Sequence, residues 1–159
     1  MKGDAKVIEF LNEALKNELT AVNQYWLHYR LLDNMGVSKL ATFERHESID
    51  EMKHADQLAE RILFLDGLPN FQMLGRLRVG ETVEEILKAD LELEYEALPP
   101  LREAIVHCEN VRDFVSRDLF AAILSNEEEH VDTLETHLGM IGQMGLPNYI
   151  QLQSEPAKG

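Results

Sequence analysis

The stretch that decides the fold is Glu51-Met52-Lys53-His54, because its Glu-x-x-His spacing recurs 76 residues later at Glu127-Glu128-Glu129-His130. A further glutamate stands 33 residues before each motif, Glu18 before the first and Glu94 before the second. A shift of 76 positions therefore carries one set of two glutamates and a histidine onto the other. If all four segments are helices, each half of the chain supplies two glutamates and a histidine to a common arrangement.

The size and composition of the chain predict one globular domain, 1–159. Its 159 residues are enough to bury a core, and 45% hydrophobic with 28% charged residues is ordinary for such a domain. No apolar run reaches the length of a membrane span, so we expect no membrane crossing. The first six residues lack the apolar core of a signal peptide, which predicts a cytoplasmic protein.

The net charge of -14 bears on the partners of the protein. It argues against nucleic acid and anionic membranes and favours cations, although an acidic surface can also serve only to keep a protein soluble. Cys108 is the single cysteine, so an internal disulfide and a Cys-x-x-Cys metal site are excluded.

Apolar residues at helical spacing, interrupted by Gly and Pro, predict four long helices and a short one. Short links join the first to the second and the third to the fourth, whereas a long crossover spans about 69–80. This all-α pattern predicts an up-down-down-up four-helix bundle with a short C-terminal helix and a frayed tail from 154. The expected helices cover about 5–33, 38–65, 82–110, 113–140 and 147–153.

Two features leave alternatives open. Pro99-Pro100 is expected to kink the third helix about one turn after Glu94, or else to divide it into two helices. The apolar residues of the last segment are expected to form an exposed patch that helps to close an assembly, or else to fold back on their own bundle. These residues are Leu146, Tyr149, Ile150 and Leu152.

The glutamates at the repeated positions are predicted to lie in the core, because apolar residues flank Glu18 and Glu127 at helical spacing. A buried carboxylate without a partner is costly, so protons or a metal must neutralise it. Glu51 and His54 lie on one face of a helix and can touch the same ion. The alternative is a set of surface glutamates and core histidines.

Two divalent cations would balance four carboxylates, and two imidazoles complete a nitrogen and oxygen ligand set. A glutamate from each of two helices plus Glu-x-x-His from each of the others is the pattern of ferritin-like di-iron or di-manganese bundles. The predicted ligands, which are also the predicted catalytic residues, are Glu18, Glu51, His54, Glu94, Glu127 and His130.

Some neighbouring residues are expected to support this site. Asp50 and Asn126 each stand four residues before a ligand histidine, and they either orient that imidazole or face solvent. Tyr25 lies on the face of Glu18, where it hydrogen-bonds a ligand carboxylate and gives up an electron, or is an ordinary core tyrosine. Glu44 and Glu47 extend an acidic stripe that either guides iron inward or faces water.

The remaining histidines, His28, His107 and His137, are predicted to be surface or packing residues.

The chain resembles a bacterioferritin over nearly its whole length. The resemblance rests on Met1-Lys2-Gly3, the segment 47–56, Arg61-Ile62-Leu63-Phe64-Leu65, Leu101-Arg102-Glu103-Ala104-Ile105 and the second Glu-x-x-His motif. It implies that the six ligands form a di-iron ferroxidase centre that oxidises Fe(II) with oxygen. It also implies a shell of twenty-four identical subunits, built from dimers, that stores a ferric mineral.

The resemblance implies further cofactors and partners. Met52 matches a residue that ligates a b-type haem between paired subunits, which passes electrons inward for iron release, and a small ferredoxin is the expected donor. His46 and Asp50 match positions at which some members hold another iron on the inner surface. Asn126 differs from members that carry an acid there, and Pro99-Pro100 is also less usual.

Spacing alone gives Met52 a simpler role. It stands one residue past a ligand, about 100° around the helix, so it faces away from the proposed centre with Ile49, Ala55, Asp56 and Ala59. An ordinary packing methionine is the commoner meaning of such a position.

Two other functions compete with iron storage. A rubrerythrin-like peroxidase shares the ligand pattern, but that family usually adds a four-cysteine iron domain, and a single cysteine argues against it. The other is a cage or bundle used only for binding or scaffolding, which six intact ligands oppose.

Overall fold

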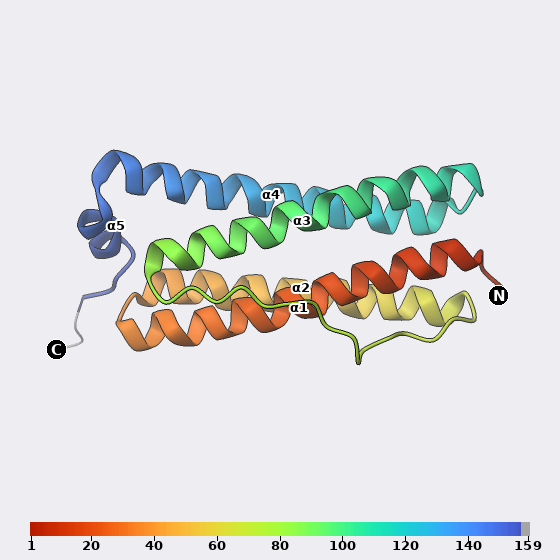
Figure 1. Ribbon diagram of the computed structural model, residues 1–159, viewed down its shortest axis with the longest axis horizontal. Coiled ribbons are helices and arrows are strands. Elements are labelled where there is room, and N and C mark those ends of the chain that lie inside the picture. Colours follow the sequence, from red (N-terminus) through yellow and green to blue (C-terminus); the bar gives the residue numbers. More distant parts are fainter. Residues whose placement is uncertain (157–159) are drawn as a thin grey trace.

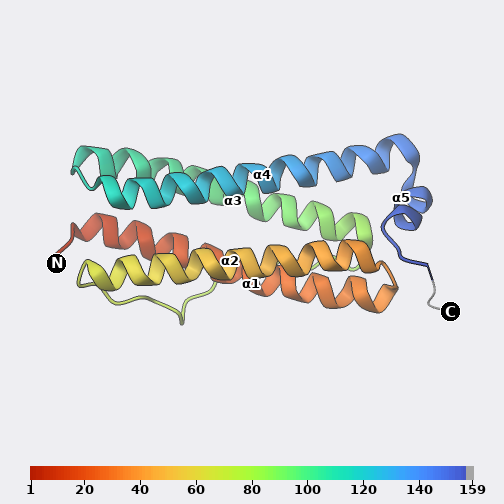
Figure 2. The same cartoon turned by 180° about the vertical axis from the view of Figure 1, so that it is seen from behind.

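The structure is a computed structural model that describes residues 1–156, and these residues form a bundle of four long helices and a short fifth one (Figure 1). The first and fourth helices run in one direction, and the second and third run in the other (Figure 1). Figure 2 shows from behind that α1 and α2 form one hairpin and α3 and α4 a second. The predicted all-α four-helix bundle is confirmed. Within residues 1–156, no helix combines the length and apolar character that crossing a bilayer requires. The helices are α1 (Ala5–Met35), α2 (Ser38–Phe64), α3 (Val83–Asn110), α4 (Phe114–Met144) and α5 (Leu146–Leu152).

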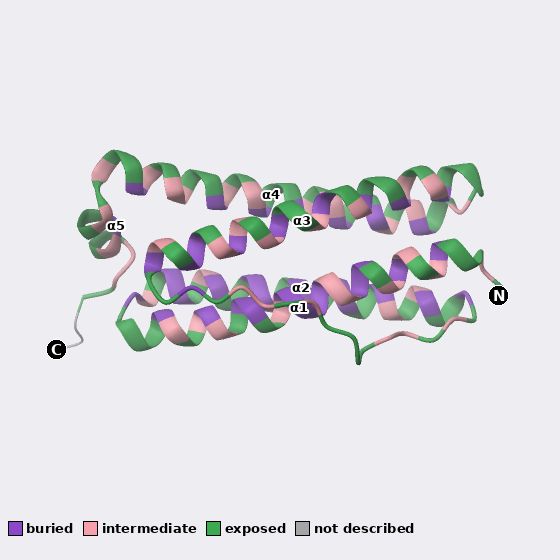
Figure 3. Ribbon diagram, in the orientation of Figure 1, coloured by how far each residue is buried: buried purple, intermediate pink, exposed green. Residues whose placement is uncertain are grey.

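The buried faces of the helices point toward one another along the whole bundle (Figure 3). One apolar cluster, which includes Leu11, Leu58 and Phe120, fills the end near the N-terminus. A second, which includes Leu40 and Leu134, fills the end near α5. Between the two clusters, the buried residues are largely acids, histidines and other polar side chains, so the apolar core is interrupted at mid-bundle.

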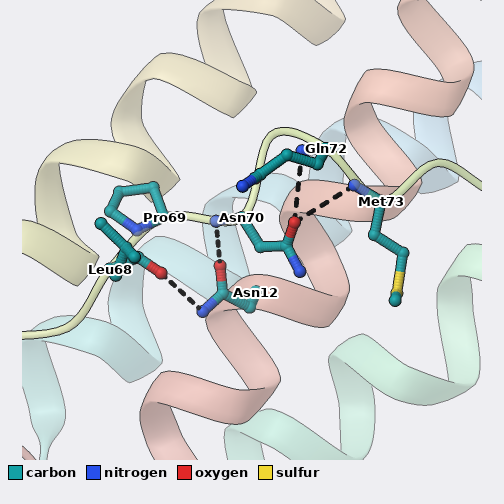
Figure 4. Close-up of a pocket in the computed structure, with 6 residues that line it drawn as sticks. All are labelled: Asn12, Leu68, Pro69, Asn70, Gln72 and Met73. Carbon is teal, nitrogen blue, oxygen red and sulfur yellow. Dashed lines mark hydrogen bonds between the residues drawn. The ribbon is translucent and has the colours of Figure 1, made fainter.

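The long crossover between α2 and α3 is held by side chains on one face of α1. Four backbone N–H groups of the crossover donate to that face, which satisfies donors that a loop without secondary structure would otherwise leave open. Figure 4 shows the first of these contacts, where Asn12 also donates to the carbonyl of Leu68. The bonds join Asn70 to Asn12, Gly75 to Thr20, Arg78 to Gln24 and Gly80 to His28, at 2.8, 2.8, 2.9 and 3.0 Å.

Gly80 is required where the crossover meets α3. A Cβ at this position would lie 2.3 Å from the backbone nitrogen of Ile86, a distance at which the backbone must move. The crossover can therefore approach the first turn of α3 closely only without a side chain there.

The third helix is continuous through both prolines, so the alternative of two separate helices is wrong. Proline lacks the N–H that the carbonyl four residues earlier would accept. Leu98 and Leu101 on either side of the pair are buried, and this packing holds the helix together across the missing bonds.

The C-terminal segment folds back on its own bundle, which corrects the expected exposed patch. Tyr149 is fully buried in the apolar cluster near α5, and its hydroxyl lies 2.6 Å from Nδ1 of His137. Of the four apolar residues in this segment, only Leu152 is largely exposed. The expected frayed tail begins with an ordered contact, since the N–H of Glu155 donates to Ser38 Oγ at 3.1 Å; positions 157–159 lie outside the described residues.

Candidate metal centre

The structure brings all six predicted ligands together at mid-bundle, and all six are buried. Their side-chain oxygens and nitrogens fall into two groups of four, within each of which the atoms lie no more than 4.8 Å apart. Each group surrounds one potential metal position, and Glu51 and Glu127 belong to both groups, so they lie between the two positions. The first group is Glu18, Glu51, His54 and Glu127, and the second is Glu51, Glu94, Glu127 and His130.

Both imidazoles turn Nδ1 toward these carboxylates. His54 Nδ1 lies 3.5 Å from both Glu18 Oε2 and Glu127 Oε1. His130 Nδ1 lies 3.1 Å from Glu51 Oε1 and 3.5 Å from Glu94 Oε1. Each histidine therefore presents the same ring nitrogen to the glutamates around it.

The donor atoms of the centre fit cations, because they are buried and lack other partners. Within the described part of the chain, each of the six residues has one such atom without a hydrogen-bond partner. A buried polar group in this state is costly unless a proton or an ion satisfies it. Four carboxylates and two imidazoles could hold two divalent cations. The atoms are Glu18 Oε2, Glu51 Oε1, His54 Nδ1, Glu94 Oε2, Glu127 Oε1 and His130 Nδ1.

Protons neutralise the centre when no metal is bound. Burial, and then the charge of neighbouring carboxylates, raises the pKa of Glu18, Glu51 and Glu94 well above the usual value. Burial disfavours the charged form of His130, but the carboxylates around the ring, Glu127 first among them, hold its pKa well above the ordinary range. Burial also works against ionised Glu127, yet Glu94 and both histidines, which lie around its carboxylate, keep its pKa well below that range.

These shifts predict how the stability of the metal-free protein depends on pH. Glu18, Glu51 and Glu94 lose their protons near pH 4.5 in the unfolded chain but keep them to higher pH in the folded one. The folded state therefore binds more protons above pH 4.5, and stability falls as pH rises. The raised pKa of His54 acts in the same direction above pH 6.5, whereas the lowered pKa of Glu127 matters only below pH 4.5.

We expect the melting temperature of the metal-free protein to fall between about pH 5 and about pH 8. Cations displace the same protons, so the stabilisation by added metal should grow over this range. Calorimetry with and without a divalent cation measures both trends. The variant Glu94→Gln should show a shallower decline, and a melting temperature of the metal-free protein that rises with pH would contradict this account.

A small cavity of about 30 Å³ lies against the carboxylates between α1 and α3. Glu18, Glu51, Glu94 and Glu127 line its inner part. Asn17, Ala21, Leu93, Glu96 and Ala97 complete its wall. The cavity has room for a water-sized species directly beside the centre.

Tyr25 and Asn126 both contact the centre. The Tyr25 hydroxyl is buried and donates to Glu94 Oε1, so this tyrosine reaches a predicted ligand as expected. Asn126 lies 3.1 Å from Nε2 of His54 on α2, whereas the sequence paired it with His130, the histidine one turn along its own helix. Asp50 likewise groups with His130 across the bundle, together with Glu47.

The acidic stripe on α2 does not face water. Glu44 is 0% exposed, and Glu47 is buried with Oε2 2.6 Å from Nε2 of His130. The alternative that both residues face water is therefore wrong, because both are buried. Glu47 instead lies against an imidazole of the centre.

His28 is part of a second buried polar group, which the sequence did not predict. It is fully buried, and its Nδ1 lies 2.8 Å from Asp90 Oδ1, near Glu44. Because its Nε2 accepts the N–H of Gly80, neutral His28 carries its proton on Nδ1 and donates it to Asp90. His28 and Asp90 therefore form a hydrogen-bonded pair that ties the crossover to α1 and α3. Both carboxylate oxygens of the nearby Glu44 have no hydrogen-bond partner among the described residues. The position of Asp90, four residues before Glu94 and so on the same face of the helix, is a feature of the sequence from which this group could have been predicted.

His107 and His137 follow the sequence expectation. His107 is partly exposed and lies 2.9 Å from Asp4, and His137 is a packing residue stacked on Phe43.

The residues expected outside the centre lie on the surface of α2. His46 and Asp50 are exposed one turn apart, and within residues 1–156 His46 joins no group of potential metal ligands. Met52 is 48% exposed and turned away from the centre, as its position in the helix predicts. Ala55, which the sequence had placed beside Met52, is buried in the bundle core instead. Met52 lines a shallow depression with Ile49, Lys53, Asp56 and Gln57.

Comparison with known proteins places this chain in a family. Residues 8–144 match the family described as Ferritin-like domain. The chain is 51% identical to the bacterioferritin of Brucella melitensis over 157 residues, which cover 99% of this chain and 98% of the relative. It is 49% identical to that of Rhodobacter capsulatus, with 98% and 97% covered, and 49% identical to that of Streptomyces coelicolor, with 99% and 97% covered. With such identities over nearly the full length of each relative, and with the ferritin-like match, this chain belongs to the bacterioferritins.

Proposed function

We propose that this bacterioferritin stores iron, and that its six-residue centre oxidises Fe(II) to Fe(III) before the ferric product is deposited as a mineral. One observation carries the proposal. The centre offers two adjacent sets of buried donor atoms that share Glu51 and Glu127 and lack other partners within residues 1–156. Buried acids with a purely structural role would be expected to satisfy one another or to meet basic side chains.

The residues of the centre bind and orient the Fe(II) substrate. Glu51 and Glu127 reach both positions and would bridge two ions, while the remaining glutamate and histidine of each set complete one position each. Two Fe(II) ions supply one electron each, and two electrons with two protons convert dioxygen to hydrogen peroxide, or peroxide to two water molecules. The buried glutamates release protons as the ions bind, which makes those protons available at the site.

Tyr25 holds one ligand in place. Its hydroxyl donates to Glu94 Oε1, which leaves the other oxygen of that carboxylate for an ion. We assign Tyr25 as a positioning residue that can also give up an electron. Asp50 on α2 orients the imidazole of His130 on α4, and Asn126 on α4 orients the imidazole of His54 on α2.

The wider assembly that we propose is a hollow shell of twenty-four identical subunits built from dimers. Met52 on the exposed face of α2 would ligate a b-type haem shared with the same residue of a second copy, and a thioether is a soft neutral ligand suited to haem iron. A small ferredoxin would supply electrons for iron release through that haem. His46 and Asp50, exposed one turn apart, would hold a further iron on the inner surface.

Aerobic addition of Fe(II) to the purified protein tests the proposed function. We expect rapid formation of Fe(III), retention of the iron on the protein and a particle much larger than a dimer at physiological salt. Oxidation without retention would favour a peroxidase-like enzyme, whereas binding without accelerated oxidation would favour a scaffold. Light scattering that shows no particle larger than a dimer would reject the shell.

A further inference from the structure

The two halves of the centre match in their ligands but not in the groups behind their histidines. The shift of 76 positions that relates the ligands carries Asp50 onto Asn126 and Glu47 onto Ile123. The two residues of α2 behind one imidazole are therefore carboxylates. Their counterparts on α4 are an amide and a hydrocarbon.

The structure places these groups at the outer nitrogens of the rings. Glu47 Oε2 lies 2.6 Å from Nε2 of His130, and Asp50 belongs to the same cluster of atoms. On the other side, the amide nitrogen Nδ2 of Asn126 lies 3.1 Å from Nε2 of His54. One imidazole thus has an anionic partner, and the other has a neutral one.

This difference changes how strongly each imidazole binds a cation. A neutral histidine that binds a metal through Nδ1 carries its proton on Nε2 and must donate it to an acceptor. A carboxylate acceptor draws on that proton and makes the ring a stronger donor to the metal. Asn126 presents Nδ2 to this ring nitrogen, so its side-chain amide must turn over to accept the same proton through Oδ1. That oxygen is neutral, so it strengthens the ring less than a carboxylate does.

We propose that the two metal positions are inequivalent, and that the position of Glu94 and His130 fills first while the position of Glu18 and His54 fills last. Glu47 and Asp50 strengthen the first, and Asn126 leaves the second weak. This inference rests on the proposed function of the centre. Outer partners of ligand histidines are worth about 10- to 100-fold in metal affinity, so the two affinities should differ by about that factor.

The inequivalence gives the weak position control over the reaction. Oxidation by a pair of Fe(II) ions requires both positions to be filled. The Fe(II) concentration at which oxidation becomes fast is then set by the affinity of the half that contains His54. Asn126 acts on that concentration through His54 and is a positioning residue.

Anaerobic titration of the metal-free protein with Co(II) tests this proposal without any redox step. We expect two binding steps per chain that differ by about 10- to 100-fold in affinity. Calorimetry and the visible absorption of bound Co(II) monitor both steps. His54→Ala should remove the weak step, and His130→Ala should remove the tight one. These two variants assign each step to its half of the centre.

Variants of the outer partners then test the cause. Asn126→Asp should tighten the weak step about 10-fold or more and leave the tight step in place, whereas Glu47→Gln should weaken the tight step. Glu103→Gln, at an exposed acid on α3, is the control and should change neither. Equal affinities in the wild type, or a weak step unchanged in Asn126→Asp, would overturn the inference while leaving the two-metal centre intact. A complete lack of Co(II) binding would overturn the proposed function as well.

Discussion

Replacing Glu127 with alanine is expected to abolish the fast phase of Fe(II) oxidation, a loss of more than about 100-fold in rate. Its two carboxylate oxygens face different histidines, with Oε1 3.5 Å from His54 Nδ1 and Oε2 3.6 Å from His130 Nδ1. The substitution therefore removes a ligand from both positions at once. The effect is measured by stopped-flow absorbance of the ferric product after the protein, loaded anaerobically with Fe(II), is mixed with aerobic buffer.

The fold should survive this substitution. The apolar clusters at both ends of the bundle hold the helices together without Glu127. The metal-free variant should nevertheless be less stable than the wild type, because Glu127 is the carboxylate whose charge Glu94 and both histidines favour. Glu128→Ala is the matched control, because it makes the same change at the next residue of α4, which is exposed. His130→Ala should also lose the fast phase. Wild-type oxidation rates in Glu127→Ala and His130→Ala would remove the basis for the assigned centre.

Met52→Leu should eliminate haem from the assembled protein while leaving oxidation of Fe(II) intact. Leucine keeps the volume of methionine but lacks the sulfur that would ligate haem iron. The side chain is 48% exposed and turned away from the centre, so the change leaves the six ligands untouched. The measurement is haem absorbance per subunit after reconstitution, together with particle size and the rate of Fe(II) oxidation.

Another exposed methionine provides the comparison. Met35, at the end of α1, is 42% exposed, and Met35→Leu should keep the full complement of haem. If Met52→Leu retains normally coordinated haem at the wild-type amount, Met52 is only a packing residue of the surface.

Helical periodicity is the reason that so much of the centre could be predicted from sequence. Glu18 and Glu127 are flanked by apolar residues at helical spacing, which places a carboxylate in the core whatever the neighbouring helix contributes. Glu-x-x-His fixes two donors on one face of one helix. Together with the relation between the halves of the chain, these local rules locate six residues on four helices at one level.

Contacts between helices were harder to predict, because they depend on how the helices are rotated and paired. Asn126 reaches His54 across the bundle instead of the histidine on its own helix, and periodicity alone gives no hint of this choice. Burial of Glu44 beside His28 and Asp90 likewise requires α1, α2 and α3 to meet at one point. The return of Tyr149 into the core depends on a partner, His137, that lies one element earlier.

The most direct test of the two-metal centre is anomalous diffraction at the iron edge from crystals soaked anaerobically in Fe(II). A centre that binds two metal ions should give two peaks in each chain, with Glu51 and Glu127 between them. One peak should lie beside Glu18 and His54, and the other beside Glu94 and His130. Two peaks at these positions would establish the centre, whereas a map with iron only at exposed acids and none among the six residues would contradict it.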